Sequence, residues 1–230
     1  MNMSGLLSAD AGGTGMERHA FAYSVGIDDF NAFRALLGKI WPQVTSLLDS
    51  AGAENFSLWE IGHLVFGYYE TEGKVSLGEE DRASYENILE QLKATGIWIS
   101  SPSEEMRLMY QDFGVVRKSK ELIRHRVFAT WLKPGMQEEY KARHDKLVEA
   151  RGGVVTQGPD SNFSIWNAGD YIIGYNEIDV TMEQEETDED RENTIAWETR
   201  MLEIMTWFTD DVDWITGERH EHIRRIAWHN

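Results

Sequence analysis

A phenol and an imidazole lie one helical turn apart in the segment Glu139–His144. Tyr140 and His144 are separated by four residues, so in a helix their side chains lie on one face. Leu147 and Arg151 are predicted to continue that face. An imidazole titrates near neutral pH and can both accept and release a proton. The pair therefore predicts a small polar site set into an apolar cavity, with His144 and Tyr140 as the catalytic candidates.

Aromatic residues after this segment are the candidates for contacting a substrate. The strand-like segment 162–166 contains Phe163 and Trp166, and a later helical segment contains Trp197. Each of these aromatic residues can also be interpreted more simply as part of the hydrophobic core. Trp197 has a helical apolar periodicity with the residues that follow it. Trp59 matches Trp166 in an earlier segment that has no histidine, which favours packing for these two tryptophans.

Composition excludes several kinds of site. The 230 residues include no Cys, so there is no disulfide, no thiolate nucleophile and no Cys-ligated zinc. A strand-like His-x-His pattern near the C-terminus is compatible with a metal, but a charged strand is the simpler interpretation; its residues are His220, His222 and His229 with Glu218 and Glu221. We expect neither a metal nor an organic cofactor.

The chain is strongly acidic, with a formal charge of −18. A polyanion such as nucleic acid, or an anionic membrane surface, is repelled by such a chain. No run approaches the roughly eighteen apolar residues of a membrane span. Residues 1–15 contain no basic residue ahead of an apolar core, so they are predicted to form a flexible leader and not a signal peptide. The cytoplasm is the default compartment.

An internal repeat organises the rest of the chain. Residues 55–70 align without gaps on residues 162–177, with eight of sixteen positions identical at an offset of 107. Two copies are too few for a solenoid. The repeat therefore predicts a duplicated domain, with copy one at 16–117 and copy two at 122–230.

Both copies show the same order of predicted elements. Those of the first are a strand at 19–25, a helix from Phe30 to Leu48, two strands meeting at Gly62, a helix at 79–92 and a last strand at 106–116. Those of the second are a strand at 126–132, the helix carrying Tyr140 and His144, two strands meeting at Gly169, a helix at 190–208 and a last strand at 223–228. This is the ferredoxin-like order.

A ferredoxin-like sheet carries helices on one face only, so its other face needs a cover. The second copy is the obvious cover for the first. The sequence thus predicts an α+β protein in which two tandem ferredoxin-like repeats pack their sheets face to face. This is a dimeric α+β barrel within one chain, a pseudo-dimer. A further homo-oligomer is left open.

The motifs of both copies resemble those of the L-rhamnose mutarotase family. They are the Tyr-x-x-x-His of the first helix, the sequence Ile40-Trp41-Pro42, the Asn-Phe-Ser-x-Trp strands and the helix of Trp197. Members of that family are usually single-copy chains that dimerise through their sheets. The resemblance implies interconversion of the α and β anomers of a free sugar, without a cofactor. It also implies that the helix His is the proton donor.

The family's site residues fall on positions of the second copy. The resemblance places the proton donor at His144 and the sugar contacts at Tyr140 and Trp197. The family's strand Tyr is replaced here by Phe163, and Glu198 stands where the family often has a second Trp. The corresponding residues of copy one are Phe33, Leu37, Phe56 and Tyr85. Because Leu37 cannot transfer protons, copy one is interpreted as a degenerate half.

Two other functions remain open. One is a different α+β barrel enzyme, an isomerase, a lyase or a cofactor-free oxygenase acting on another small molecule, with His144 still the acid or base. The other is a carbohydrate-binding protein without turnover. A mutarotase speeds the approach of a single anomer to equilibrium and consumes nothing. An oxygenase consumes oxygen, and a binding protein changes no rate. The sequence does not identify the sugar, and a deoxy sugar is one candidate.

Overall fold

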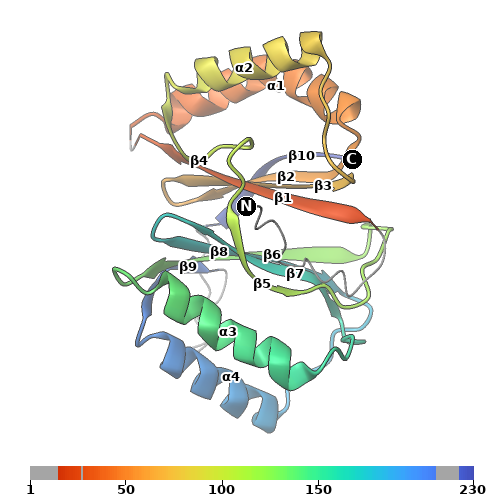
Figure 1. Ribbon diagram of the computed structural model, residues 1–230, viewed down its shortest axis with the longest axis vertical. Helices are drawn as coiled ribbons and strands as arrows, with labels where there is room; N and C mark the ends of the chain where they lie inside the picture. The colour runs from red at the N-terminus through yellow and green to blue at the C-terminus, as the bar shows by residue number, and fades with distance from the viewer. Residues whose placement is uncertain (1–14, 27, 211–222) are drawn as a thin grey trace, which may run out of the picture.

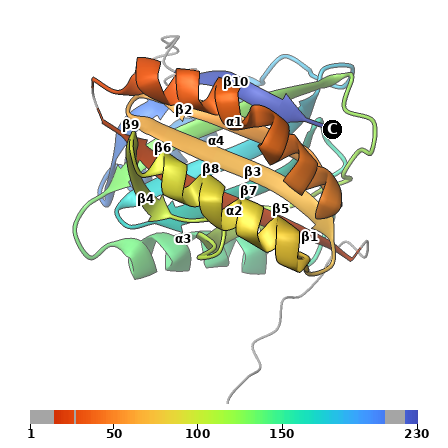
Figure 2. The ribbon, with the colours of Figure 1, turned by 90° about the horizontal axis from the view of Figure 1, so that it is seen from above.

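The computed structural model describes residues 15–26, 28–210 and 223–230. Two five-stranded antiparallel sheets lie face to face in the middle of the molecule, and a pair of helices covers the outer face of each (Figure 1). The two helices over the first sheet, α1 (Phe30–Ser50) and α2 (Glu79–Leu92), run roughly along the direction of its strands (Figure 2). The predicted α+β fold with two repeats, paired within one chain, is confirmed. The expected leader lies almost wholly outside the described residues.

The elements follow the predicted order in both repeats. Those of the first are β1 (Met16–Val25), α1 (Phe30–Ser50), β2 (Ala53–Ile61), β3 (Leu64–Glu72), α2 (Glu79–Leu92) and β4 (Gly96–Ser100). Those of the second are β6 (Ile123–Leu132), α3 (Gln137–Arg151), β7 (Asp160–Ala168), β8 (Tyr171–Asp179), α4 (Asp188–Met201) and β9 (Met205–Asp210). Two further strands are β5 (Arg107–Asp112) and β10 (Ile223–His229).

The two further strands are exchanged between the repeats. The strand orders are β10-β2-β3-β1-β4 and β5-β7-β8-β6-β9. In Figure 1, β10, from the blue end of the chain, lies in the same sheet as the orange strands β2 and β3. The prediction that 106–116 and 223–228 close their own copies is therefore wrong. Each repeat is closed by β4 or β9, which the sequence analysis did not identify, and each then extends a strand into the other repeat's sheet.

The second helix of the second repeat is shorter than predicted. It begins with a capping box, in which the Thr187 hydroxyl accepts from the Asp190 amide and the Asp190 carboxylate accepts from Thr187. It ends at Met201 and not at residue 208. The residues beyond it include Thr206 and Trp207, which are β-branched and aromatic and so favour the strand β9.

Three apolar clusters hold the layers together. One lies between the two sheets, and one lies between each sheet and its helices. In both repeats a glycine makes room for a ring on the neighbouring strand. A Cβ on Gly67 would lie 1.9 Å from Phe21, and one on Gly174 would lie 2.0 Å from Phe128. These glycines are therefore needed because the phenyl rings lie directly over their backbone.

Four buried polar side chains join the two sheets. The amide of Asn55 donates to Glu177 at 2.7 Å and to Glu70 at 3.2 Å. The amide of Asn162 donates to both carboxylates in the same way. Asn55 and Asn162 have positive φ angles of 54° and 51°. The repeat thus places two asparagines in left-handed backbone, where each reaches the carboxylates of both sheets. We call these four residues the amide–carboxylate network.

Tyrosines and cations complete this network. The rings of Tyr68 and Tyr175 stack across the interface with centroids 3.9 Å apart. Each hydroxyl donates to the carboxylate two residues further along its strand, at 2.9 Å. Lys120 forms an ion pair with Glu177 at 2.6 Å, and Arg18 donates to the Asn162 side-chain oxygen at 2.5 Å. Both buried carboxylates therefore have hydrogen-bond donors as neighbours, and Glu177 also has an opposite charge beside it.

A further polar side chain between the sheets is the half-buried His125. Its ring lies 5.9 Å from that of Trp59 and 5.8 Å from that of Tyr175. Burial, followed by the nearby charges of Arg225 and Lys120, lowers the pKa of His125 to about 4. His125 is therefore neutral at physiological pH.

Within the part of the chain that the structure describes, no helix has the length and apolar character needed to cross a bilayer.

The strand exchange predicts how one repeat behaves alone. A fragment of residues 122–230 lacks β5, so the edge of β7 and the apolar inner face of its sheet are left uncovered. We expect two such fragments to pair, with β10 of each taking the place of β5 in the other. Light scattering after size exclusion should therefore give twice the fragment mass. A well-folded monomer would contradict the exchanged architecture.

The amide–carboxylate network predicts a large cost for one substitution. Asn162→Gly tolerates the positive φ but removes two hydrogen bonds to buried carboxylates, each worth about 1.5–3 kcal/mol. We expect the free energy of unfolding to fall by about 2–5 kcal/mol. Asn162→Ala should lose about 1 kcal/mol more, because an L residue is strained in left-handed backbone. Urea denaturation measures both. Wild-type stability in Asn162→Gly would show that this network does not hold the sheets.

Candidate active site

Helix α3 places Tyr140 and His144 together on its inner face. Both are buried, with 2% and 4% of their surface exposed. Their rings stack with centroids 4.4 Å apart. The expected adjacency of the two side chains is present. The buried face of α3 includes fewer residues than expected. Leu147 is 38% exposed, and Arg151 forms an ion pair with Asp112. The helix thus buries a polar pair where α1 buries an apolar stripe.

The hydrogen bond made by His144 fixes its tautomer. Nδ1 lies 3.0 Å from the backbone oxygen of Tyr140. A carbonyl oxygen only accepts hydrogen bonds, so Nδ1 carries the proton and Nε2 keeps its lone pair. Burial is the main cause that lowers the pKa of His144 to about 4. At neutral pH the ring is therefore uncharged, and Nε2 is poised to accept a proton and not to donate one.

Aromatic rings from three other elements surround His144. Trp197, on α4, meets it edge-on with centroids 5.1 Å apart. Tyr110, on the exchanged strand β5, lies 5.2 Å away. Phe163, on β7, packs against Tyr110 at 5.5 Å. The imidazole is thus enclosed by rings from both halves of the chain, because β5 comes from the segment that follows the first repeat.

The structure does not bring Trp166 to this cluster. Side chains alternate between the two faces of a strand, so Phe163 and Ile165 face the helices while Ser164 and Trp166 face the other sheet. Trp166 is 4% exposed in the core between the sheets, and its indole donates to the Ser164 hydroxyl at 2.9 Å. Trp59 occupies the matching place in the first repeat. Both tryptophans pack the interface and do not lie beside His144.

Two neighbours of the cluster were missed by the sequence analysis. Tyr110 had been assigned to the first copy's sheet, so its position beside His144 was not foreseen. Glu198 was noted only as a departure from the family pattern. It is 4% exposed. Burial, and then the charge of Glu198, raises the pKa of Tyr140 far above its usual value. Tyr140 therefore stays protonated and can donate a hydrogen bond.

The first repeat has an apolar counterpart at each of these positions. Phe33 and Leu37 match Tyr140 and His144. The tenth residue of α2 is Ile88 and the tenth of α4 is Trp197. The expected match of Tyr85 to Trp197 is therefore wrong. The first repeat keeps the scaffold without a titratable group at the histidine position.

Metal ligands do not gather in the described part of the chain. No group of three or more His, Asp or Glu side chains there is arranged to hold a metal ion. The C-terminal candidates His220, His222, Glu218 and Glu221 lie outside the described residues. His229 is described, and it pairs with Asp49 at 2.7 Å.

Comparisons with known proteins agree with the repeat. Residues 18–98 and 125–226 match the model of the L-rhamnose mutarotase family. The matched segments leave out the exchanged strand β5. A search of curated proteins found no match.

Two solved structures align with this chain over most of its length. One is described as an anthrone oxidase-like protein, with 12% identity, a TM-score of 0.41 and coverage of 92% of this chain and 93% of that one. The other is described as a monooxygenase from Fusobacterium nucleatum, with 5% identity, a TM-score of 0.42 and coverage of 91% and 96%. Similarities at this level carry no argument about function.

The lowered pKa of His144 predicts a pH dependence of stability. The unfolded histidine titrates near 6.5 and the folded one near 4, so the unfolded chain binds more protons between these values. The stability that neutral His144 contributes is complete above pH 6.5 and is lost as the pH falls toward 4. Between pH 7 and 5.5 the loss should be about 1 kcal/mol. Urea unfolding of His144→Asn should lack this part of the loss. An unchanged pH dependence would mean that His144 titrates normally in the fold.

Proposed function

The chain belongs to the L-rhamnose mutarotase family, and we propose that it interconverts the α and β anomers of a free sugar at His144. The observation that carries the proposal is the free Nε2 of a neutral, buried imidazole whose other nitrogen is held by a backbone carbonyl. Such a group accepts a proton in its resting state. Leu37 stands at the matching place in the first repeat, so the proposal is one active site per chain.

The reaction moves one proton between two oxygens of the sugar. Nε2 takes the proton of the anomeric hydroxyl while the bond between the anomeric carbon and the ring oxygen breaks. The electron pair of that bond stays on the ring oxygen, which then receives the proton from the imidazolium. The product is the open-chain aldehyde, and closure on its other face reverses both steps. One histidine can serve as base and then as acid, because nothing is gained or lost overall.

Tyr140 and Tyr110 are proposed to position the sugar. The Tyr140 phenol, which stays protonated, stacks beside the imidazole and can donate to a sugar oxygen. Phe163 lacks the hydroxyl that the family's strand tyrosine offers. Tyr110 packs against Phe163 and lies beside His144, so its hydroxyl can replace the missing one.

The walls of the site favour a sugar with an apolar edge. Trp197 and Phe163 present rings, and the surrounding core is apolar, with Met201 and Met205 among its members. A deoxy sugar with a methyl group in place of a hydroxymethyl group loses less hydration beside such apolar walls than a fully hydroxylated sugar does. The proposed substrate class is therefore a free deoxy aldose.

Replacing His144 separates catalysis from packing. His144→Asn keeps a polar side chain of similar reach but cannot titrate near neutral pH. We expect the rate of anomer exchange to fall by at least about 10², the contribution of positioned proton transfer. Saturation transfer between the NMR signals of the two anomers measures this rate for a set of deoxy sugars.

The matched control is His125→Asn. His125 is half-buried and its pKa is also lowered to about 4, but it lies between the sheets, beside Trp59 and Tyr175. Its replacement should leave the exchange rate per folded molecule unchanged. If His144→Asn exchanged anomers as fast as the parent, His144 would have no part in the reaction.

A further inference from the structure

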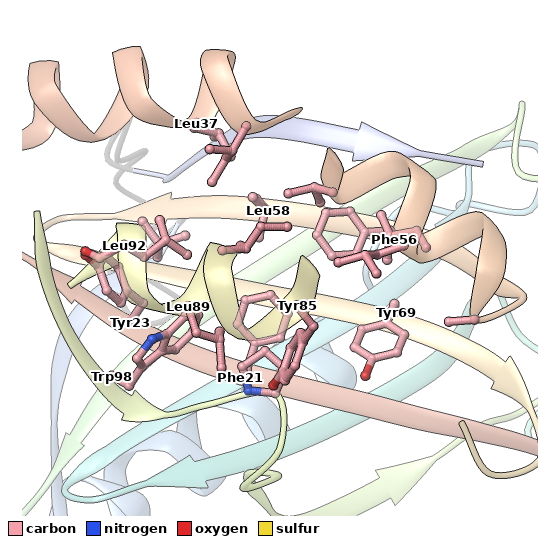
Figure 3. A pocket seen from close by; sticks show the side chains of 18 of the residues that line it. Phe21, Tyr23, Leu37, Phe56, Leu58, Tyr69, Tyr85, Leu89, Leu92 and Trp98 are labelled. Carbon is pink, nitrogen blue, oxygen red and sulfur yellow. The ribbon is translucent and has the colours of Figure 1, made fainter. Parts of the chain in front are cut away.

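The first repeat contains an apolar cavity between its sheet and its two helices. The cavity has a volume of about 160 Å³. Leu37 reaches toward it from α1, Leu58 from β2 and Leu89 from α2 (Figure 3). Aromatic rings, among them Phe56 and Tyr85, form other parts of the wall. The space lies in the position where the second repeat holds its histidine cluster.

Apolar residues line this cavity at positions where the second repeat has polar groups. Leu37 stands in place of His144. Leu89 matches Glu198, since each is the eleventh residue of its helix.

The exchanged strands also carry different residues at matching positions. Ala227 pairs with Leu58 in the first sheet, as Tyr110 pairs with Ile165 in the second. An alanine therefore occupies the place of the tyrosine ring beside His144. The positions that hold His144, Glu198 and Tyr110 in the second repeat therefore hold Leu37, Leu89 and Ala227 in the first.

The lining is poorly suited to a sugar. Sugar hydroxyls lose their water on entering and find few partners among lining side chains that are mostly aliphatic or aromatic, which is costly. Tyr23 lines the cavity, but its hydroxyl already donates to the backbone oxygen of Leu92 and lies 3.0 Å from the Thr95 hydroxyl. Charged side chains are absent from the lining residues. An ion would therefore have no counter-charge in the wall.

The size of the cavity fits a small ring system. An apolar protein cavity of about 150 Å³ stays dry and binds benzene. Left empty, such a space destabilises the fold, because the lining atoms lose their packing contacts. Val75 and Leu77, in the segment between β3 and α2, are also lining residues, and both are half-buried.

We propose that the first repeat binds a small, uncharged hydrophobic molecule of one or two rings in this cavity. This site is separate from the cluster around His144 and does not depend on its chemistry. The duplication has thus given two sites of different character on one scaffold, one with a polar pair at its centre and one lined mainly by apolar side chains.

Indole is a suitable probe, since it is neutral and has two fused rings. Titration calorimetry on the full chain should give one indole per chain, with a dissociation constant of about 10⁻⁴ to 10⁻³ M, as expected for a ligand with few atoms. Methyl NMR should show shifts at Leu37, Leu58 and Leu89. L-Rhamnose should leave these three signals unmoved.

A matched pair of variants tests the location. Leu58→Phe extends into the cavity, so it should raise the melting temperature and weaken indole binding at least about tenfold. Ile165→Phe, at the same place in the filled second repeat, should lower the melting temperature by overpacking and leave indole affinity unchanged. The proposal is overturned if the parent protein binds no indole up to its solubility limit. It is also overturned if the methyl shifts fall on Ile165 and Ile172 of the second repeat, or if Leu58→Phe binds indole as the parent does.

Discussion

Two buried glutamates that share two asparagine amides are the constraint on which this structure depends. Glu70 and Glu177 lie between the sheets, where an unpaired carboxylate would be very costly. Asn55 and Asn162 satisfy both of them only when the sheets meet in one register. Apolar packing between sheets tolerates small shifts, whereas a hydrogen-bonded charge network does not. The network therefore specifies how the two repeats face one another.

A fixed double sheet leaves the outer layers free to differ. The inner faces of the two repeats are nearly equivalent, with Tyr68 stacked on Tyr175 and an asparagine in left-handed backbone in each. The outer faces are not. One carries a buried imidazole among aromatic rings, and the other carries an apolar cavity. Residues between the sheets serve assembly, so substitutions under the helices can change chemistry without disturbing the pairing.

The repeat in the sequence was sufficient to predict the fold class. The match of residues 55–70 with 162–177 indicates that the two segments have the same backbone conformation. The spacing of Tyr140 and His144 indicates that both lie on one face of a helix. Both are local properties of the chain. Pairing between strands is not local, so the alternation in Arg107–Asp112 marked a strand without revealing which sheet it joins.

The same reason explains which site residues were found and which were missed. Tyr140, His144 and Trp197 come from helices whose faces the periodicity defines. Tyr110 reaches the cluster only through the exchange of β5, so no pattern in its own segment indicates its role. Trp166 is a large aromatic residue close to Phe163 in the sequence, and only the pairing of the sheets shows that it faces the opposite way.

The exchanged strands also set an order for folding during synthesis. The sheet nearest the start of the chain is completed by β10, which comes from residues 223–229. Until those residues leave the ribosome, the edge of β2 has no partner and offers its backbone groups to any neighbouring strand. The first repeat therefore cannot mature as an independent unit ahead of the second, although domains usually fold in the order in which they are made. A chaperone that protects open sheet edges would act on this protein late, when more than two hundred residues have already been translated.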